Sequence, residues 1–140
     1  MINLGHWVTE LEIPEDPYGF IYVITNTDNN HKYIGKKQCK TILKRAPLKG
    51  KKRKRHVEKD TDWRTYTGSC NKLNSDIESI GKDKFIFEII RFCNNKWELA
   101  YFEMKEQLEK DVLISDQYYN GIINARIGKI PDETRRLLEE

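Results

Sequence analysis

Cysteine is scarce in this sequence, and its spacing excludes two common ways of holding a small domain together. The three thiols, Cys39, Cys70 and Cys93, stand far apart, with no C-x-x-C pair and no histidine near enough to complete a zinc set. An odd number of distant cysteines is typical of free thiols in a reducing compartment. We therefore expect neither disulfides nor a structural zinc ion, and we expect a cytoplasmic protein.

Long apolar runs are also missing. No stretch approaches the roughly 20 apolar residues that a membrane span requires, and the first residues lack the apolar core of a secretion signal. We expect no membrane partner. The 140 residues suffice for a single domain with a modest core.

Acidic residues are absent from one segment, residues 36–56, which carries eleven lysines or arginines. The rest of the chain has 14 basic and 22 acidic residues, so the net charge of +3 conceals a strong segregation. Such a segment favours a polyanionic partner such as DNA, although a solvated loop would carry the same run. Pro47 and Gly50 interrupt any helix, so we expect a loop or a second hairpin. The candidate DNA-binding residues are Lys36, Lys40, Lys44, Lys51, Lys52, Arg53, Lys54 and Arg55.

A β-hairpin is predicted between Tyr18 and Lys37, because two runs of aromatic and β-branched residues flank a polar turn at residues 27–30. Each predicted strand carries one tyrosine, Tyr22 in the first and Tyr33 in the second. Aromatic pairs on neighbouring strands usually stabilise a sheet, so the tyrosines alone do not indicate chemistry.

The remaining elements predict a small α+β domain. Residues 71–80 have helical periodicity before Gly81, with Ser69 as a possible cap, and residues 85–92 alternate as a third strand. The fold class is therefore a single domain with a three-stranded antiparallel sheet flanked by helices. We divide it into a lead-in (1–17), the domain with its basic insert (18–124) and a tail with a short helix (125–140).

A helix over residues 96–109 is predicted by a capping box formed by Asn95 and Glu98. Glu103 projects beside its apolar stripe, so its carboxylate should lie at the rim of the core. The predicted stripe consists of Trp97, Ala100, Tyr101, Met104 and Leu108.

Four segments, taken in order, resemble one family. Residues 20–22 (FIY) and 33–35 (YIG) resemble the motif pair that names the GIY-YIG nucleases. Residues 99–103 resemble that family's helix with its metal-binding glutamate, and Tyr119-Asn120 resembles its later asparagine. Residues 66–88 are similar to the middle of the phage homing-endonuclease branch, so the resemblance spans about residues 18–124.

The resemblance implies a metal-dependent endonuclease that hydrolyses phosphodiester bonds in DNA, located in the host cytoplasm if the gene is phage-encoded. Glu103 would bind Mg²⁺ or another divalent cation such as Mn²⁺. Tyr22 would position or deprotonate the attacking water, helped by a nearby cation such as Lys37, and Tyr33 would support the same network. Asn120 would hold the core or the scissile region through its amide.

The sequence departs from the family pattern at two places. Phe20 stands where the first motif has glycine, with Gly19 one residue earlier. The family's arginine follows the second motif by eight to ten residues on a helix, and the basic insert disrupts that spacing. Arg45 has the closest spacing and Arg64 lies in an ordered-looking segment, with Arg53 and Arg55 as further candidates. The alternative functions are a non-catalytic nucleic-acid-binding protein and a domain whose basic run is only solvated.

Overall fold

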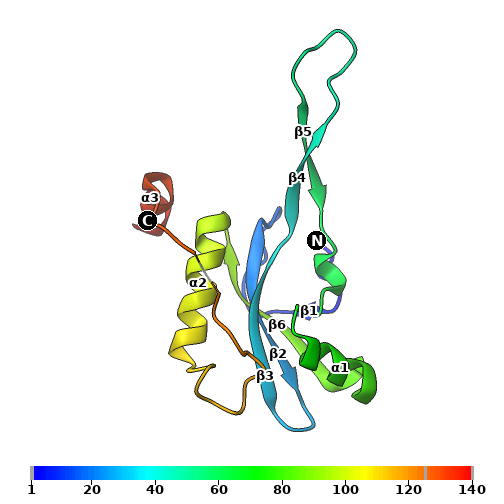
Figure 1. The fold of residues 1–140 in the computed structure, drawn as a ribbon, viewed down its shortest axis with the longest axis vertical. Helices are drawn as coiled ribbons and strands as arrows, with labels where there is room; N and C mark the ends of the chain where they lie inside the picture. Colours follow the sequence, from blue (N-terminus) through cyan, green and yellow to red (C-terminus); the bar gives the residue numbers. More distant parts are fainter. Residues whose placement is uncertain (1, 125, 140) are drawn as a thin grey trace.

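A computed structural model describes residues 2–124 and 126–139, and its centre is a mixed four-stranded sheet (Figure 1). The strand order is β1-β6-β2-β3, in which β2 pairs antiparallel with both β3 and β6. The predicted hairpin, its turn and the third strand are therefore confirmed. The strands are β1 (Trp7–Val8), β2 (Gly19–Asn26), β3 (His31–Gln38) and β6 (Phe85–Cys93).

The lead-in adds a fourth strand to the three-stranded sheet expected from the sequence. Strand β1 lies parallel to β6, with Trp7 opposite Phe87. Trp7 is buried, packs on Phe20 and Tyr22, and donates its indole N–H to the carbonyl of Trp63 at 2.5 Å. The lead-in is thus attached through one aromatic side chain that fills the core and satisfies its own polar atom.

Alternating residues of β2 supply two separate cores, one on each face of the sheet. Phe20, Tyr22 and Ile24 belong to the core that includes Trp7 and Trp63, whereas Ile21 belongs to the core that contains Leu99 of α2. Strand β2 is buried along most of its length because both faces are covered. The sheet therefore separates the two cores.

The described residues form three α-helices: α1 (Asn71–Ile80), α2 (Lys96–Glu109) and α3 (Asp132–Glu139). Helices α1 and α2 pack on the sheet, whereas α3 contacts the start of α2, where Asn95 donates to Thr134 at 2.9 Å. Helix α2 begins as predicted, because the Asn95 side chain accepts the Glu98 N–H at 2.9 Å. Helix α1 begins after Cys70 with no side-chain cap, so the suggested Ser69 cap is wrong. Two short 3₁₀ helices, η1 (Trp63–Thr65) and η2 (Lys82–Lys84), precede α1 and β6 respectively.

The face that α2 buries differs from the predicted stripe. Leu99, Phe102 and Gln107 are buried, whereas Leu108 is exposed. Trp97 instead meets the C-terminal segment, where its indole donates to the Gly128 carbonyl at 3.0 Å. Helix α2 has apolar residues on two sides. The stripe predicted from the sequence lies on the side that meets the C-terminal segment, and the other side packs on the sheet.

The basic insert forms a second hairpin of strands β4 (Lys40–Arg45) and β5 (Arg55–Asp60), which we call the arm (residues 40–60). Figure 1 shows the arm projecting well beyond the sheet. One of the two alternatives left open by the sequence, the hairpin, is therefore the one observed.

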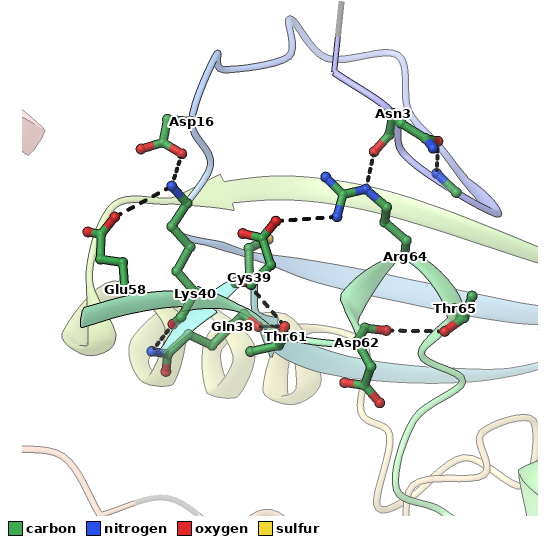
Figure 2. A network of polar contacts seen from close by, with 12 residues as sticks. Asn3, Asp16, Gln38, Cys39, Lys40, Glu58, Thr61, Asp62, Arg64 and Thr65 are labelled. Carbon is green, nitrogen blue, oxygen red and sulfur yellow. Dashed lines mark hydrogen bonds and ion pairs between the residues drawn. The ribbon is translucent and has the colours of Figure 1, made fainter. Parts of the chain in front are cut away.

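A polar network holds the root of the arm against the body, as Figure 2 shows. Lys40, at the start of β4, pairs with Asp16 and with Glu58, the latter at 3.7 Å. At the other strand, Arg64 pairs with Asp60 at 3.7 Å and donates to the Asn3 carbonyl at 2.8 Å. The root is thus fixed on both strands, whereas the tip beyond Arg45 is exposed.

Among the described residues, no helix combines the length and apolar character needed to cross a bilayer.

Replacing residues 46–54 by Asn-Gly, a preferred two-residue hairpin turn, should leave the body folded, because the arm tip packs against nothing in either core. We expect the melting temperature to change by less than about 2 °C, measured by circular dichroism. Trp7→Ala is the positive control, since losing a buried indole should cost about 3–5 kcal/mol. A large drop in the melting temperature of the arm-shortened protein would show that the tip supports the body.

Candidate active site

The outer edge of β3 organises the site, because β3 is the last strand of the sheet and its outward backbone groups need partners. At Lys32 the partners are backbone groups: the Lys32 N–H donates to Gln117 at 2.9 Å and its carbonyl accepts from Tyr119 at 2.7 Å. Beyond Lys32, side chains take over.

Two side-chain amides complete the edge at Ile34. Asn120 accepts the Ile34 N–H at 3.0 Å through its Oδ1 and donates its Nδ2 to the Ile34 carbonyl at 2.8 Å. Gln107 of α2 donates to the same carbonyl at 3.0 Å. Asn120 is buried and bonded on both ends of its amide, so it holds β3 in place between Tyr33 and Gly35.

Glu103 lies at the next outward position, beside Lys36. Its Oε1 is 3.6 Å from Lys36 Nζ, and its side chain is only 16% exposed. Burial raises the pKa of Glu103, and the charge of Lys36 together with hydrogen bonds from its side chain and backbone opposes that rise. Because Lys36 only partly offsets the cost of burying the Glu103 carboxylate, a further positive charge nearby would stabilise its charged form.

The spacing of Glu103 and Gln107 matches the spacing of their targets. Four residues of helix advance about 6 Å, and two residues of strand advance about 6.7 Å. Because α2 runs opposite to β3, Gln107 contacts Ile34 and Glu103 contacts Lys36. The sequence signal for Gln107, which our sequence reasoning missed, was its position four residues after the glutamate.

Tyr22 lies on the other face of the sheet from α2, in the core of Trp7 and Trp63. It is 1% exposed, and its hydroxyl lies beneath Gly35 and Gly68: a Cβ at Gly35 would collide with Tyr22 Oη, and one at Gly68 would lie 3.3 Å from it. The Tyr22 ring centroid is 6.2 Å from that of Tyr33. The two tyrosines of the predicted motif are thus together, with Gly35 as the residue that lets them approach.

The pKa of Tyr22 is raised well above that of a free phenol, first by burial and then by Tyr33, Tyr66, Glu103 and Cys70. Burial also raises the pKa of Tyr33, which a hydrogen bond from Ser69 partly offsets. Both phenols therefore keep their protons at neutral pH. We expected neighbouring lysines to stabilise a phenolate, but the surroundings of Tyr22 and Tyr33 favour the protonated phenols.

Lys37 is the cation that the structure places beside the tyrosines. Its Nζ lies 4.1 Å from the centroid of the Tyr66 ring, which in turn lies 6.3 Å from the ring of Tyr22. It also pairs with Asp62 at 2.8 Å, and its side chain is 18% exposed. Lys36, its neighbour in β3, projects to the opposite face and pairs with Glu103.

Neither favoured arginine reaches this group. Arg45 is the last residue of β4, opposite Arg55, and lies out in the arm. Arg64 is engaged by Asp60 and the Asn3 carbonyl at the root, with its guanidinium 4.3 Å from the Trp63 ring. No described contact joins either arginine to a tyrosine of the motif or to Glu103.

The predicted DNA-binding residues fall into three groups. Lys36 is paired with Glu103, and Lys40 is bound into the root by Asp16 and Glu58. The exposed cations of the tip are Lys51, Lys52, Arg53, Lys54 and Arg55. The backbone of Lys44 lies in β4, and its side chain lies outside the described part of the structure.

The donor set fits a hard cation held by few protein ligands. Within residues 2–124 and 126–139, no three histidine, cysteine or acidic side chains gather, so Glu103 belongs to no such cluster. Mg²⁺ keeps most of its waters and commonly takes one or two carboxylates together with substrate phosphates. A single poorly compensated carboxylate is consistent with that mode of binding.

Gly35→Ala should lower the free energy of unfolding by about 1–3 kcal/mol, because the new methyl group would collide with the Tyr22 hydroxyl. Gly121→Ala is the matched control, since no atom lies within 4 Å of the position that its new methyl group would occupy. Adding Tyr22→Phe should restore part of the loss. Equal unfolding free energies for the two alanine variants, measured in urea, would contradict the close approach.

Glu103→Gln should leave the protein at least as stable as the wild type at pH 7. The folded-state pKa of Glu103 is raised, so its ionisation disfavours folding: stability is full below the unfolded pKa of about 4.3 and declines as pH rises through the folded pKa. The gap between variant and wild type should close below about pH 4 in urea titrations. Glu109→Gln, at an exposed position of the same helix, controls for loss of charge, and a destabilised Glu103→Gln at pH 7 would reverse the sign.

Comparison with known proteins agrees with this geometry. Residues 6–123 match the family model described as "Putative endonuclease segE, GIY-YIG domain". No curated protein and no solved structure matches the chain significantly. The match begins at the residue before β1 and ends just past Asn120, so it includes the tyrosine pair, the arm, Glu103 and the asparagine that closes the β3 edge. The chain belongs to the GIY-YIG nuclease family.

Proposed function

We propose that this protein is a metal-dependent DNA endonuclease of the phage homing-endonuclease-like type. The observation that carries the proposal is the position of Glu103, a mostly buried carboxylate at the β3 edge whose charge helps to raise the pKa values of Tyr22 and Tyr33. A carboxylate with only a structural role would gain nothing from remaining undercompensated there.

Glu103 would hold Mg²⁺ or Mn²⁺, with waters and a substrate phosphate as the other ligands. When bound, the ion would supply positive charge against the phosphoryl oxygens and lower the pKa of a coordinated water. The reaction adds water across one P–O bond and leaves a phosphate on one end of the strand and a hydroxyl on the other.

The tyrosines take different roles because their exposure differs. Tyr33 is half-buried, so its hydroxyl can donate a hydrogen bond to a water or a phosphate oxygen at the surface. Tyr22 is enclosed beneath Gly35, where it positions Tyr33 and the strand. Both act as protonated donors, in line with their raised pKa values.

Lys37 takes the part of the missing arginine in this proposal. It lies beside the tyrosine group, against the Tyr66 ring, and its pairing with the exposed Asp62 can be exchanged for a phosphate. Arg64 could reach the site only by leaving Asp60 and Asn3, and Arg45 belongs to the arm. Asn120 acts through Ile34, by fixing the strand that carries Tyr33.

The arm would bind DNA away from the scissile phosphate. Its tip carries only cations among its charged residues, and a two-stranded ribbon fits the major groove of B-DNA. Contacts of this kind neutralise phosphates, so the affinity they add should fall steeply with salt.

A non-catalytic nucleic-acid-binding protein is the second candidate. It is favoured by the enclosure of Tyr22 and by the absence of an arginine from the described contacts of the tyrosines and Glu103. Both candidates predict salt-dependent DNA binding, so cleavage distinguishes them.

Supercoiled plasmid should be nicked by the wild type in Mg²⁺ or Mn²⁺, and Glu103→Gln should lower the rate by about 100-fold or more, because several kcal/mol of charge stabilisation would be lost. Glu109→Gln should cleave like the wild type. Fluorescence anisotropy on a labelled duplex should show that both variants still bind. Undiminished cleavage by Glu103→Gln would refute its role, and binding without cleavage by the wild type would establish the second candidate.

A further inference from the structure

A cleft of about 220 Å³ lies between the last residues of β3 and the first turns of α2. Four of its lining residues are cations, and no described lining residue is acidic. The cations are Lys36, Lys37, Lys96 and Arg126. Neither Lys96 nor Arg126 belongs to the tyrosine motif or to the basic insert, so the cleft is a basic surface separate from the arm.

The cleft carries surplus positive charge. Lys36 is partly neutralised by Glu103 at 3.6 Å, and the ammonium of Lys37 lies on the other face of the sheet, where it pairs with Asp62 at 2.8 Å. Lys96 and Arg126, both exposed, have no carboxylate within 4.0 Å among the residues that the structure describes. The two unpaired cations therefore line a cleft in which no described lining residue is an acid.

The one acid in the first turn of α2 does not compensate this charge. Glu98 is 2% exposed, and its carboxylate accepts hydrogen bonds from the amides of Asn94 and Asn95 at 3.3–3.5 Å. Its carboxylate and the Asn95 cap instead offset the positive start of helix α2. The exposed cations therefore carry the charge of the cleft and favour an anion.

The position of the cleft indicates which anion. Along β3 its lining runs from Lys36, beside Glu103, to Gln38, two residues before the arm begins at Lys40. Figure 1 shows β3 leading into β4 alongside the start of α2. A strand of DNA following the β3 edge would meet Glu103, then the cleft, then the arm. Leu99 and Ala100 give the cleft an apolar wall suited to a sugar.

We propose that this cleft binds a backbone phosphate of the DNA strand next to the scissile one, with Lys96 and Arg126 as its principal contacts. The inference rests on the proposed function for the identity of the substrate. The guanidinium of Arg126 can bind two phosphate oxygens at once, and Lys96 adds a point charge. The site would fix the register of the strand with respect to Glu103 and would carry no sequence preference.

The test uses Lys96→Ala, Arg126→Ala and the double variant, with Lys105→Ala as the matched control because Lys105 is an exposed lysine on the same helix. Binding to a labelled duplex is measured by anisotropy without metal between 50 and 200 mM salt. In the double variant, the negative slope of log affinity against log salt should become shallower by about 1 to 2, and binding should weaken about 10-fold at low salt. Arg126→Lys should retain most of the slope.

Nicking by the same variants separates this inference from the proposed function. The double variant should raise KM and leave kcat within about 2-fold, since the contact is made equally in the ground and transition states. If the wild type binds but never cleaves, and the double variant still loses slope, the cleft is upheld and the nuclease proposal falls. If the double variant matches Lys105→Ala in slope, affinity and KM, the cleft proposal is overturned even though the wild type cleaves.

Discussion

Strand β3 lies at the edge of the sheet, and the need to satisfy its outward backbone groups determines how residues 103–120 pack against it. A terminal strand leaves a row of outward N–H and C=O groups that must be satisfied or exposed. Here the row is closed in order by the backbone of residues 117–119, by Asn120 and Gln107 at Ile34, and by Glu103 at Lys36. The side chains that satisfy this edge are polar, so the same residues that complete the sheet could also bind a substrate or a metal ion in the proposed function.

Gly35 links the two faces of the sheet at that edge. On one face it leaves room for the Tyr22 hydroxyl, and on the other its neighbour Lys36 meets Glu103. The result is a small region where two protonated phenols and an undercompensated carboxylate interact electrostatically across one strand. Such an arrangement costs stability, because burial disfavours the charged form of Glu103, and this cost is typical of a functional site.

Local signals predicted much of the fold. The β2–β3 hairpin, strand β6 and the Asn95 cap are encoded within short stretches, so periodicity and capping chemistry sufficed. Features set by distant packing were missed or left open. Strand β1 depends on Trp7 reaching Trp63, and the buried face of α2 depends on which of two apolar sides meets the sheet. The choice of Arg45 rested on its distance from Gly35 along the chain, and the structure places Arg45 in the arm.

The proposal that Glu103, at the β3 edge, binds the divalent cation can be tested by paramagnetic broadening with Mn²⁺. Substoichiometric Mn²⁺ added to ¹⁵N-labelled protein should broaden the amides of Gly35, Lys36 and Glu103 first, and Glu103→Gln should abolish that broadening. The acidic groups at the root of the arm, Asp16, Glu58 and Asp60, are the competing carboxylates. Broadening that begins at the root and persists in Glu103→Gln would contradict the account.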